Sequence, residues 1–125
     1  GLMERQNTSL DSVVYFLLEA SAKDFHDNQV PAPVDFRNVQ VKYLPGSKKE
    51  NIYLICGEFL VKDNQDKAEW TSFTTIKTDP YEQWIGSSAL TYCREAKKLP
   101  YKLNDLSSAL KNRLDSVQKI NNSTK

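Results

Sequence analysis

The chain has 125 residues, of which 39% are hydrophobic and 26% charged, so it is long enough for one domain with a buried core. Seventeen Lys and Arg residues against sixteen Asp and Glu residues give a net charge of +1. With no clustered basic surplus, this balance argues against nucleic-acid binding and against strong attraction to anionic membranes. No apolar stretch approaches the roughly 20 residues that a membrane-spanning helix needs.

The first predicted element is an amphipathic helix that begins at Thr8 or Ser9 and ends near His26. Either hydroxyl side chain is a good N-cap, and apolar residues recur behind it at helical spacing. That apolar stripe comprises Leu10, Val13, Val14, Leu17, Leu18, Ala22 and Phe25. Tyr15 and Phe16 widen it, so we expect a well-covered helix, preceded by a flexible segment over the first seven residues.

Three strand-like segments follow, over residues 36–43, 52–61 and 70–77. The first alternates apolar and polar residues, the second is apolar on both faces as a central strand is, and the third is rich in Thr and aromatic residues. Turn-forming residues over 45–51 and 63–67 separate the three segments. Two short turns joining three strands predict an antiparallel meander, to which a fourth strand could be added.

Asp79-Pro80-Tyr81-Glu82 has the form of a helix start. Asp can cap a helix, Pro suits the first helical position, and a Glu three residues after the cap completes a capping box. The apolar face of the predicted helix comprises Tyr81, Ile85, Ala89, Tyr92, Cys93 and Ala96. Gly86 lies within this helix and either allows a close approach to the sheet or divides the helix into two pieces, and Pro100 ends it.

Asn104 is the predicted cap of a last helix, in which apolar residues are spaced by three or four. These residues are Leu103, Leu106, Leu110, Leu114 and Val117. The predicted fold is therefore a single α+β domain over residues 8–120, with a flexible end over residues 121–125. It has an N-terminal helix, a meander of three or four antiparallel strands, and two C-terminal helices.

The two cysteines lie in the two most patterned segments, Cys56 in the central strand and Cys93 on the apolar face of the helix after it. Neither belongs to a Cys-x-x-Cys motif, and two Cys with one His do not complete a four-ligand zinc site. The alternatives are a disulfide, which is favoured, or two buried free thiols. A disulfide would fix this helix to the sheet and contribute about 4 kcal/mol by chain entropy.

Two short motifs, Phe36-Arg37-Asn38-Val39 and Cys56-Gly57-Glu58, resemble segments of small bacterial cell-envelope proteins, which are often lipoproteins. That group has a second cysteine later in the chain, where Cys93 stands here. The resemblance covers residues 36–64 and implies export to the periplasm or secretion, together with a disulfide, but it carries no activity. The start at Gly1 fits a mature chain from which an export signal or a lipid anchor has been removed, as it also fits removal of an expression tag.

His26, the only histidine, stands with Asp24 and Asp27 at the predicted end of the first helix. A metal or general-base site needs convergent groups, and Asp24 and His26 face different sides of a helix. A group that can carry positive charge is favoured near a helix C-terminus, so a structural role is the better interpretation. We therefore predict no metal ligand, no cofactor and no catalytic residue.

The candidate binding residues are Arg37, Glu58, Tyr81, Gln83 and Trp84. Trp and Tyr are enriched at binding hot spots, so the last three could contact a partner, although core packing is the alternative. Glu58 projects from an apolar strand. Its pKa would be raised if it were buried, or it would pair with a basic residue such as Arg37 or Arg94.

The sequence as a whole predicts an exported, non-enzymatic binding domain, monomeric or weakly dimeric, with a protein, peptide or glycan partner. One alternative is a hydrolase that uses Glu58 and Glu82, and this needs Glu58 in an open cleft and not paired to Arg. Another is an inhibitor or immunity-type protein, because a helix against a curved antiparallel sheet suits a cystatin-like shape.

Overall fold

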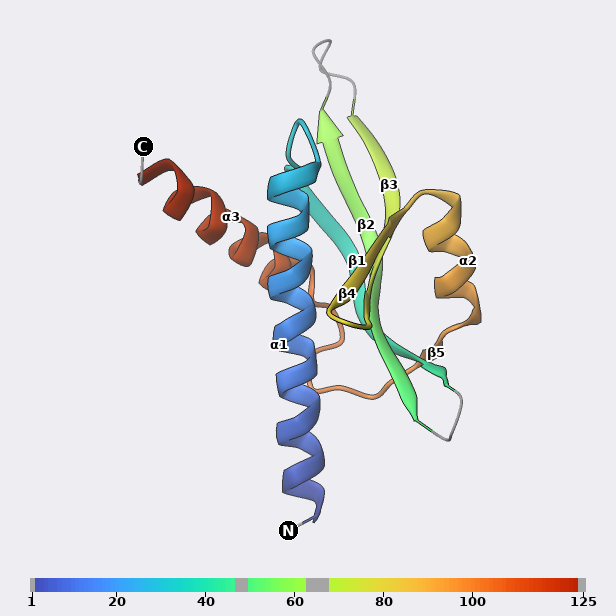
Figure 1. The fold of residues 1–125 in the computed structure, drawn as a ribbon. Coiled ribbons are helices and arrows are strands. Elements are labelled where there is room, and N and C mark those ends of the chain that lie inside the picture. Colours follow the sequence, from blue (N-terminus) through green and yellow to red (C-terminus); the bar gives the residue numbers. More distant parts are fainter. Residues whose placement is uncertain (1, 47–49, 63–67, 124–125) are drawn as a thin grey trace.

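The structure, a computed structural model, describes residues 2–46, 50–62 and 68–123 and has helices on both faces of one antiparallel sheet (Figure 1). The elements are α1 (Leu2–Asn28), β1 (Asp35–Pro45), β2 (Asn51–Lys62), β3 (Ala68–Lys77), β4 (Tyr81–Ile85), α2 (Ser87–Glu95), β5 (Lys97–Lys98) and α3 (Ser107–Ser123). The strand order is β4-β3-β2-β1-β5, and each neighbouring pair is antiparallel. The α+β class is confirmed, with five strands in place of the three or four expected.

The larger core lies between the sheet and the two long helices, α1 and α3. Its buried side chains come from both layers and include Leu17, Phe25, Phe36, Val39, Ile55, Phe59, Phe73, Leu106, Leu110 and Leu114. Phe25 stands at its centre, with its ring 5.0 Å from those of both Phe59 and Phe73. Burial of each such side chain contributes roughly 1.5–3 kcal/mol, so this layer carries most of the apolar stabilisation.

Helix α2 covers the opposite face of the sheet through a smaller core. Leu54, Cys56 and Ile76 are buried there, and Tyr92 and Cys93 of α2 pack against them. Cys56 and Cys93 form a disulfide across a sequence separation of 37. The predicted disulfide is therefore confirmed, and it links the central strand to the helix that covers it.

The apolar stripe of α1 is confirmed by the burial of Val14, Leu17 and Phe25. The helix begins at Leu2, upstream of the expected cap at Thr8 or Ser9. Tyr15 does not widen the stripe as expected. It is 56% exposed, and its ring lies 4.8 Å from the guanidinium carbon of Arg113 on α3. None of the helices in the described ranges has the length and apolar composition that crossing a membrane requires.

The helix expected to start at Pro80 is wrong over its first seven residues. Residues 81–85 form strand β4, which pairs with β3 from Tyr81↔Lys77 to Ile85↔Phe73. Gly86 follows with a φ of 75°, and α2 begins only at Ser87. The physical reason is that Tyr, Trp and Ile are strong strand formers, and the five residues of Tyr81–Ile85 pair with the otherwise uncovered edge of β3. Gly86 was expected either to allow a close approach to the sheet or to divide the helix, and the structure shows that it divides the predicted element into a strand and a helix.

Helix α3 is attached to the outer edge of β1. The Leu106 amide donates to the Val39 carbonyl at 2.7 Å, and the Val39 amide donates to Ser107 Oγ at 3.2 Å. Asp105, not the predicted Asn104, caps α3, because Asp105 Oδ1 accepts from the Ser107 amide at 2.9 Å. The expected stripe is confirmed from Leu106 onward, whereas Leu103 is 49% exposed.

Candidate functional site

A groove of about 450 Å³ lies between the C-terminal part of α1 and strand β4. It is lined by Asp24, Phe25 and Asn28 of α1, by Gln29 directly after this helix, and by Tyr81, Gln83 and Ile85 of β4. The three β4 residues share a face because side chains alternate along a strand. Their register partners on β3 include Phe73 and Thr75, which belong to the buried α1 side of the sheet. The predicted binding residues Tyr81 and Gln83 thus lie together in one groove.

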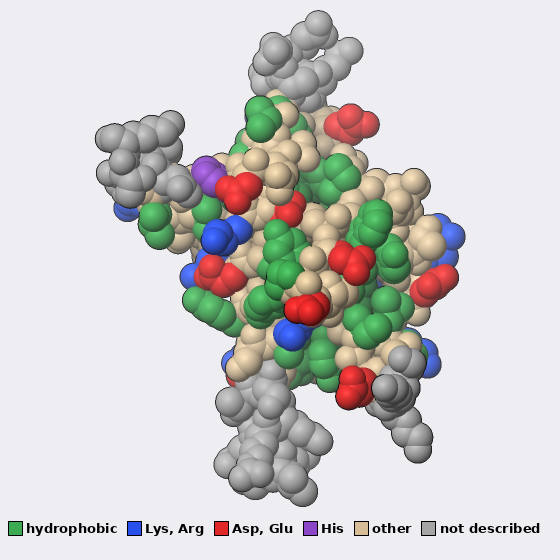
Figure 2. Space-filling view, viewed as in Figure 1, with side chains coloured by type: hydrophobic (Ala, Val, Ile, Leu, Met, Phe, Trp, Pro, Cys, Tyr) green, Lys and Arg blue, Asp and Glu red, His purple; other side chains and the backbone are tan. Residues whose placement is uncertain are grey.

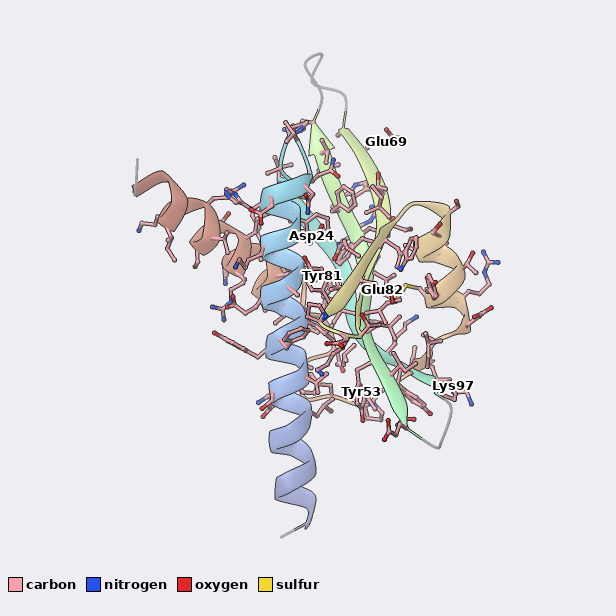
Figure 3. All side chains as sticks on the ribbon, viewed as in Figure 1. Asp24, Tyr53, Glu69, Tyr81, Glu82 and Lys97 are labelled. Atoms are coloured by element: carbon pink, nitrogen blue, oxygen red, sulfur yellow. A yellow bond between two sulfur atoms is a disulfide. The ribbon has the colours of Figure 1, made fainter. Side chains whose placement is uncertain are left out.

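A hydrogen bond joins the two walls of the groove. The Tyr81 hydroxyl donates to Asp24 Oδ2 at 2.9 Å, and Figure 3 shows the two residues beside each other between α1 and β4. Burial, followed by this bond and the negative charges of Asp24 and Asp27, raises the pKa of Tyr81 to about 12. Tyr81 is therefore a fixed, protonated donor and not a proton acceptor at neutral pH.

A buried chain of polar groups holds Gln83 in place. The Ser21 and Thr75 hydroxyls are hydrogen-bonded to each other, and Thr75 Oγ1 donates to Gln83 Oε1. Ser21 and Thr75 are fully buried. Gln83 Nε2 is also buried, and within the described ranges it has no hydrogen-bond partner. An unsatisfied buried donor costs about 1–3 kcal/mol, and an acceptor atom on a ligand would remove that cost.

The backbone of β4 presents an open edge beside the groove. Gly86 donates its amide to the Ser72 carbonyl at 2.8 Å, and the Pro80 carbonyl accepts from Thr78 at 3.2 Å. In an antiparallel ladder such inward-bonded residues alternate with outward-facing ones. The amides and carbonyls of Tyr81, Gln83 and Ile85 therefore point away from β3, and no described strand pairs with them.

Trp84 occupies the other face of β4, as the alternation requires. Its ring lies 5.7 Å from that of Tyr92 on α2, and its Nε1 donates to Glu82 Oε1 at 3.1 Å. Trp84 is still 37% exposed. The structure thus separates Trp84 from Tyr81 and Gln83, which the sequence had grouped on one helical surface.

Arg37 and Glu58 lie apart from the groove, on β1 and β2. Arg37 Nε and Nη2 each donate to a Glu58 carboxylate oxygen at 3.1 Å, and the guanidinium stacks 4.1 Å from the Trp70 ring. The hydrogen bond from Arg37, assisted by one from Asn38, lowers the pKa of Glu58. Of the two alternatives for Glu58, the pairing with Arg37 is the one observed. The hydrolase interpretation required a Glu58 that is not paired to Arg, and this requirement is not met.

The cluster at the end of α1 is divided, because Asp24 is hydrogen-bonded to Tyr81 of β4. Asp24 turns toward Tyr81, and His26 lies in the last turn of the helix. Among the residues that the structure describes, no group of three or more His, Cys, Asp or Glu side chains is placed to hold a metal ion.

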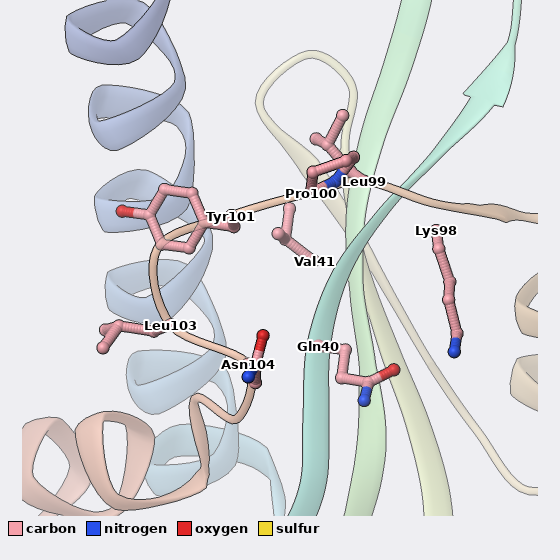
Figure 4. A pocket seen from close by; sticks show the side chains of 8 residues that line it. All are labelled: Gln40, Val41, Lys98, Leu99, Pro100, Tyr101, Leu103 and Asn104. Atoms are coloured by element: carbon pink, nitrogen blue, oxygen red, sulfur yellow. The ribbon is translucent and has the colours of Figure 1, made fainter.

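A second groove, of about 440 Å³, runs along the other end of the sheet (Figure 4). It lies between β1 and the segment that connects β5 to α3, and its lining includes Gln40, Leu99, Tyr101 and Leu103. Lys98 of β5 also lines it. The Tyr101 hydroxyl is bonded to Asp11 on α1, which ties the connecting segment down. Among its described residues this groove has no orphaned buried side-chain group, and the edge strand beside it, β5, has only two residues, so the first groove is the stronger candidate.

Sequence reasoning missed Asp24 and Ile85 as groove residues. Asp24 was weighed only as part of a metal or general-base site, and its partner Tyr81 is 57 positions away. Ile85 was assigned to a helix core, although it is 48% exposed. The signal that could have found them is the period of two in Tyr81, Gln83 and Ile85.

No protein-family model, curated protein or solved structure matches this chain. The site is therefore interpreted from its own geometry.

Proposed function

We propose that this protein is a non-enzymatic binding domain that holds an extended segment of a partner protein in the groove between α1 and β4. The observation that carries the proposal is the outward-facing backbone of Tyr81, Gln83 and Ile85 beside a groove whose polar side chains are fixed from behind. Peptide recognition often uses such an exposed strand edge, with pockets for alternate side chains.

The chemistry of the lining supports binding over catalysis. Tyr81 holds its proton in the bond to Asp24, and Gln83 offers only an amide. Ile85 adds exposed apolar surface at one end of the groove. General acid–base catalysis needs two positioned proton-transfer groups, and the lining of this groove holds one carboxylate, Asp24, which is already bonded to Tyr81.

We also infer that the protein works in an oxidising compartment, the periplasm or the exterior of the cell. The disulfide between Cys56 and Cys93 supports this, because disulfides persist in exported proteins and are rare in the cytosol. The resemblance of the Phe36–Val39 and Cys56–Glu58 segments to bacterial envelope proteins agrees with that location.

The test is a selection of random nine-residue peptides on the folded, oxidised protein, followed by affinity measurements on the enriched peptides. We expect Ile85→Lys to weaken binding at least tenfold. Val34→Lys is the matched control, because Val34 is 46% exposed against 48% for Ile85 and lies outside the groove. Equal affinity of both variants for the enriched peptides would reject the groove as the binding site, as would a failure to enrich any peptide.

A further inference from the structure

We infer that the bound segment adds to the outer edge of β4 as a sixth strand and carries Lys or Arg side chains that face the carboxylates on both sides of that edge. This inference depends on the function proposed above and specifies the chemistry of the partner. It joins two independent features of β4, its free backbone groups and its acidic surroundings.

The backbone feature fixes the conformation of the partner. Tyr81, Gln83 and Ile85 each direct an amide and a carbonyl outward, at a spacing that only an extended chain matches. A helix has no free backbone groups to offer along its length, so it cannot satisfy this edge. Because β4 has five residues and ends at Gly86, the added strand is limited to about five paired residues.

The side-chain feature fixes the charge of the partner. Asp24 is the one charged residue that lines the groove, and Glu82 is the one charged residue on the opposite face of β4. The ion pairs of the described residues are Arg37–Glu58, Lys102–Asp11 and Arg113–Glu19, so neither carboxylate has a cationic partner there. Figure 2 shows acidic side chains among hydrophobic ones on this face of the molecule, together with several Lys and Arg side chains.

Two basic residues of the described chain, Lys77 and Lys23, lie near this edge. Lys77 pairs with Tyr81 across β3 and β4, but its ammonium group lies 5.4 Å from the centre of the Phe16 ring on α1. Lys23, next to Asp24 in sequence, is on an exposed face of α1 and does not line the groove. Within the part of the chain that the structure describes, neither Asp24 nor Glu82 has a cationic partner.

A second copy of this chain is the less favourable occupant of the same edge. A two-fold pairing of β4 with β4 would bring the same surface together from both copies. Asp24 and Glu82 of each copy would then lie beside a strand that carries the same negative charges, and like charges across an interface are destabilising. A basic segment of another protein meets no such repulsion.

The test uses the tightest peptide from the selection described above. In one version of this peptide, Glu replaces every Lys and Arg residue. In two further versions, every second backbone amide is N-methylated, at the odd positions in one peptide and at the even positions in the other. We expect the Glu version to bind at least tenfold more weakly. We expect N-methylation to abolish binding when it falls on the amides that point toward β4, because these amides donate to the ladder. N-methylation of the other set of amides should have little effect.

Variants of the protein examine the same ladder from the other side. Ile85→Pro removes an outward-facing amide without removing a bond to β3, and Ile85→Thr keeps that amide while losing the same apolar surface. We expect Ile85→Pro to bind at least fivefold more weakly than Ile85→Thr, with equal thermal stability of the two variants. Circular dichroism and the amide spectra verify that both are folded.

The outcomes separate this inference from the proposed function. Enriched peptides that bind the groove but are neutral or acidic, or that tolerate N-methylation of either set of amides, overturn the inference and leave the binding function standing. Absence of any groove-dependent peptide removes both. A concentration-dependent dimer that Ile85→Pro abolishes would assign the edge to a second copy of the chain and overturn the basic partner.

Discussion

The Tyr81 hydroxyl on β4 donates a 2.9 Å hydrogen bond to Asp24 on α1, and so ties the edge strand to the helix that forms the other wall of the groove. Strand β4 has only β3 as a neighbour in the sheet, and a five-residue strand at an edge is weakly held by its ladder alone. The bond therefore matters for the order of the site as well as for its chemistry.

Tyrosine ionisation should report this bond directly. The pKa of Tyr81 is raised to about 12, as is that of Tyr101, which burial and a bond to Asp11 hold protonated. In a spectrophotometric titration at 295 nm we expect two tyrosines to ionise late, and Tyr81→Phe and Tyr101→Phe each to remove one of them. Two late-ionising tyrosines remaining in Tyr81→Phe would contradict the assignment.

The same shift makes stability fall at alkaline pH. Because the folded pKa of Tyr81 lies above its ordinary value of 10.0, its contribution is fully present below pH 10 and is lost as the pH rises toward 12. Tyr81→Phe should lose the bond at all pH values, at a cost of about 1 kcal/mol at pH 7. Urea unfolding at pH 7 and pH 11 should show the gap between wild type and variant narrowing at the higher pH.

The disulfide should supply a large part of the stability. Closing a loop with a sequence separation of 37 contributes about 4 kcal/mol by chain entropy. We expect the double variant Cys56→Ala, Cys93→Ala to lose roughly 2–5 kcal/mol in urea unfolding. Intact mass after alkylation should show no modified thiol without reductant and two with it. Two modified thiols in the unreduced protein would contradict the bond.

Much of the fold follows from local patterns in the sequence. The apolar spacing of Leu17 and Phe25 predicted the buried face of α1, and alternation together with turn residues placed β1, β2 and β3 to within about two residues. Both patterns predict which face of a helix or strand is buried, and they do so without information on the distant segment that packs against that face. This is why the cores were predictable while the identity of the facing residues was not.

The segment from Asp79 to Ile85 shows where local patterns fail. Tyr81 and Ile85 are four apart, as a helix face requires, but with Gln83 between them they also form the period of two of a strand. The choice is made by pairing with β3, which local sequence does not encode. Tyr81 and Gln83 were thus selected for a helical surface that does not exist. The bond from Tyr81 to Asp24 had no local signal, because 57 positions separate the two residues.

Two glycines should resist substitution for different reasons. A Cβ atom at Gly57 would lie 2.7 Å from Val39 Cγ2 and 3.0 Å from Val39 Cα, so Gly57→Ala overpacks the contact between β1 and β2. At Gly86 nothing lies within 4 Å, but the φ of 75° strains any L-residue. We expect each alanine variant to lose about 1–3 kcal/mol in urea unfolding.

D-alanine distinguishes the two mechanisms at Gly86, since its backbone favours positive φ. Ligation at Cys93 allows this residue to be introduced by synthesis of the preceding segment. We expect the protein with D-alanine at position 86 to be at least as stable as wild type. A loss equal to that of Gly86→Ala would show that space, and not backbone conformation, restricts this position.

The cap of α3 gives a prediction with a clear control. Asp105→Ala should cost about 1 kcal/mol at pH 7, because it removes the acceptor of the Ser107 amide, whereas Asn104→Ala should change stability little. Hydrogen bonds from the Ser107 hydroxyl and amide lower the pKa of Asp105. The charged cap therefore stabilises the fold above the ordinary aspartate pKa and loses its effect as pH falls through the lowered value. Unfolding curves at pH 7 and pH 2.5 should show the deficit of Asp105→Ala shrinking in acid.

The buried chain Ser21–Thr75–Gln83 links stability to the groove. Thr75→Val keeps the shape of the side chain but leaves Gln83 Oε1 and the Ser21 hydroxyl without their shared partner, which should cost about 1–3 kcal/mol. Ser21→Ala should cost less, since Thr75 still bonds to Gln83. The double variant should be no less stable than Thr75→Val alone, because it removes one of the two groups left unpaired.

Peptide affinity then shows whether this chain positions Gln83 for binding. Thr75 is fully buried and touches no ligand, so its effect on affinity must pass through the side chain that it holds. We expect Thr75→Val to weaken groove-binding peptides severalfold and to broaden the side-chain amide signal of Gln83, while Ser21→Ala leaves both nearly unchanged. If Thr75→Val lowered stability but bound peptide like wild type, Gln83 would be a packing residue, and the groove would depend on β4 and Asp24 alone.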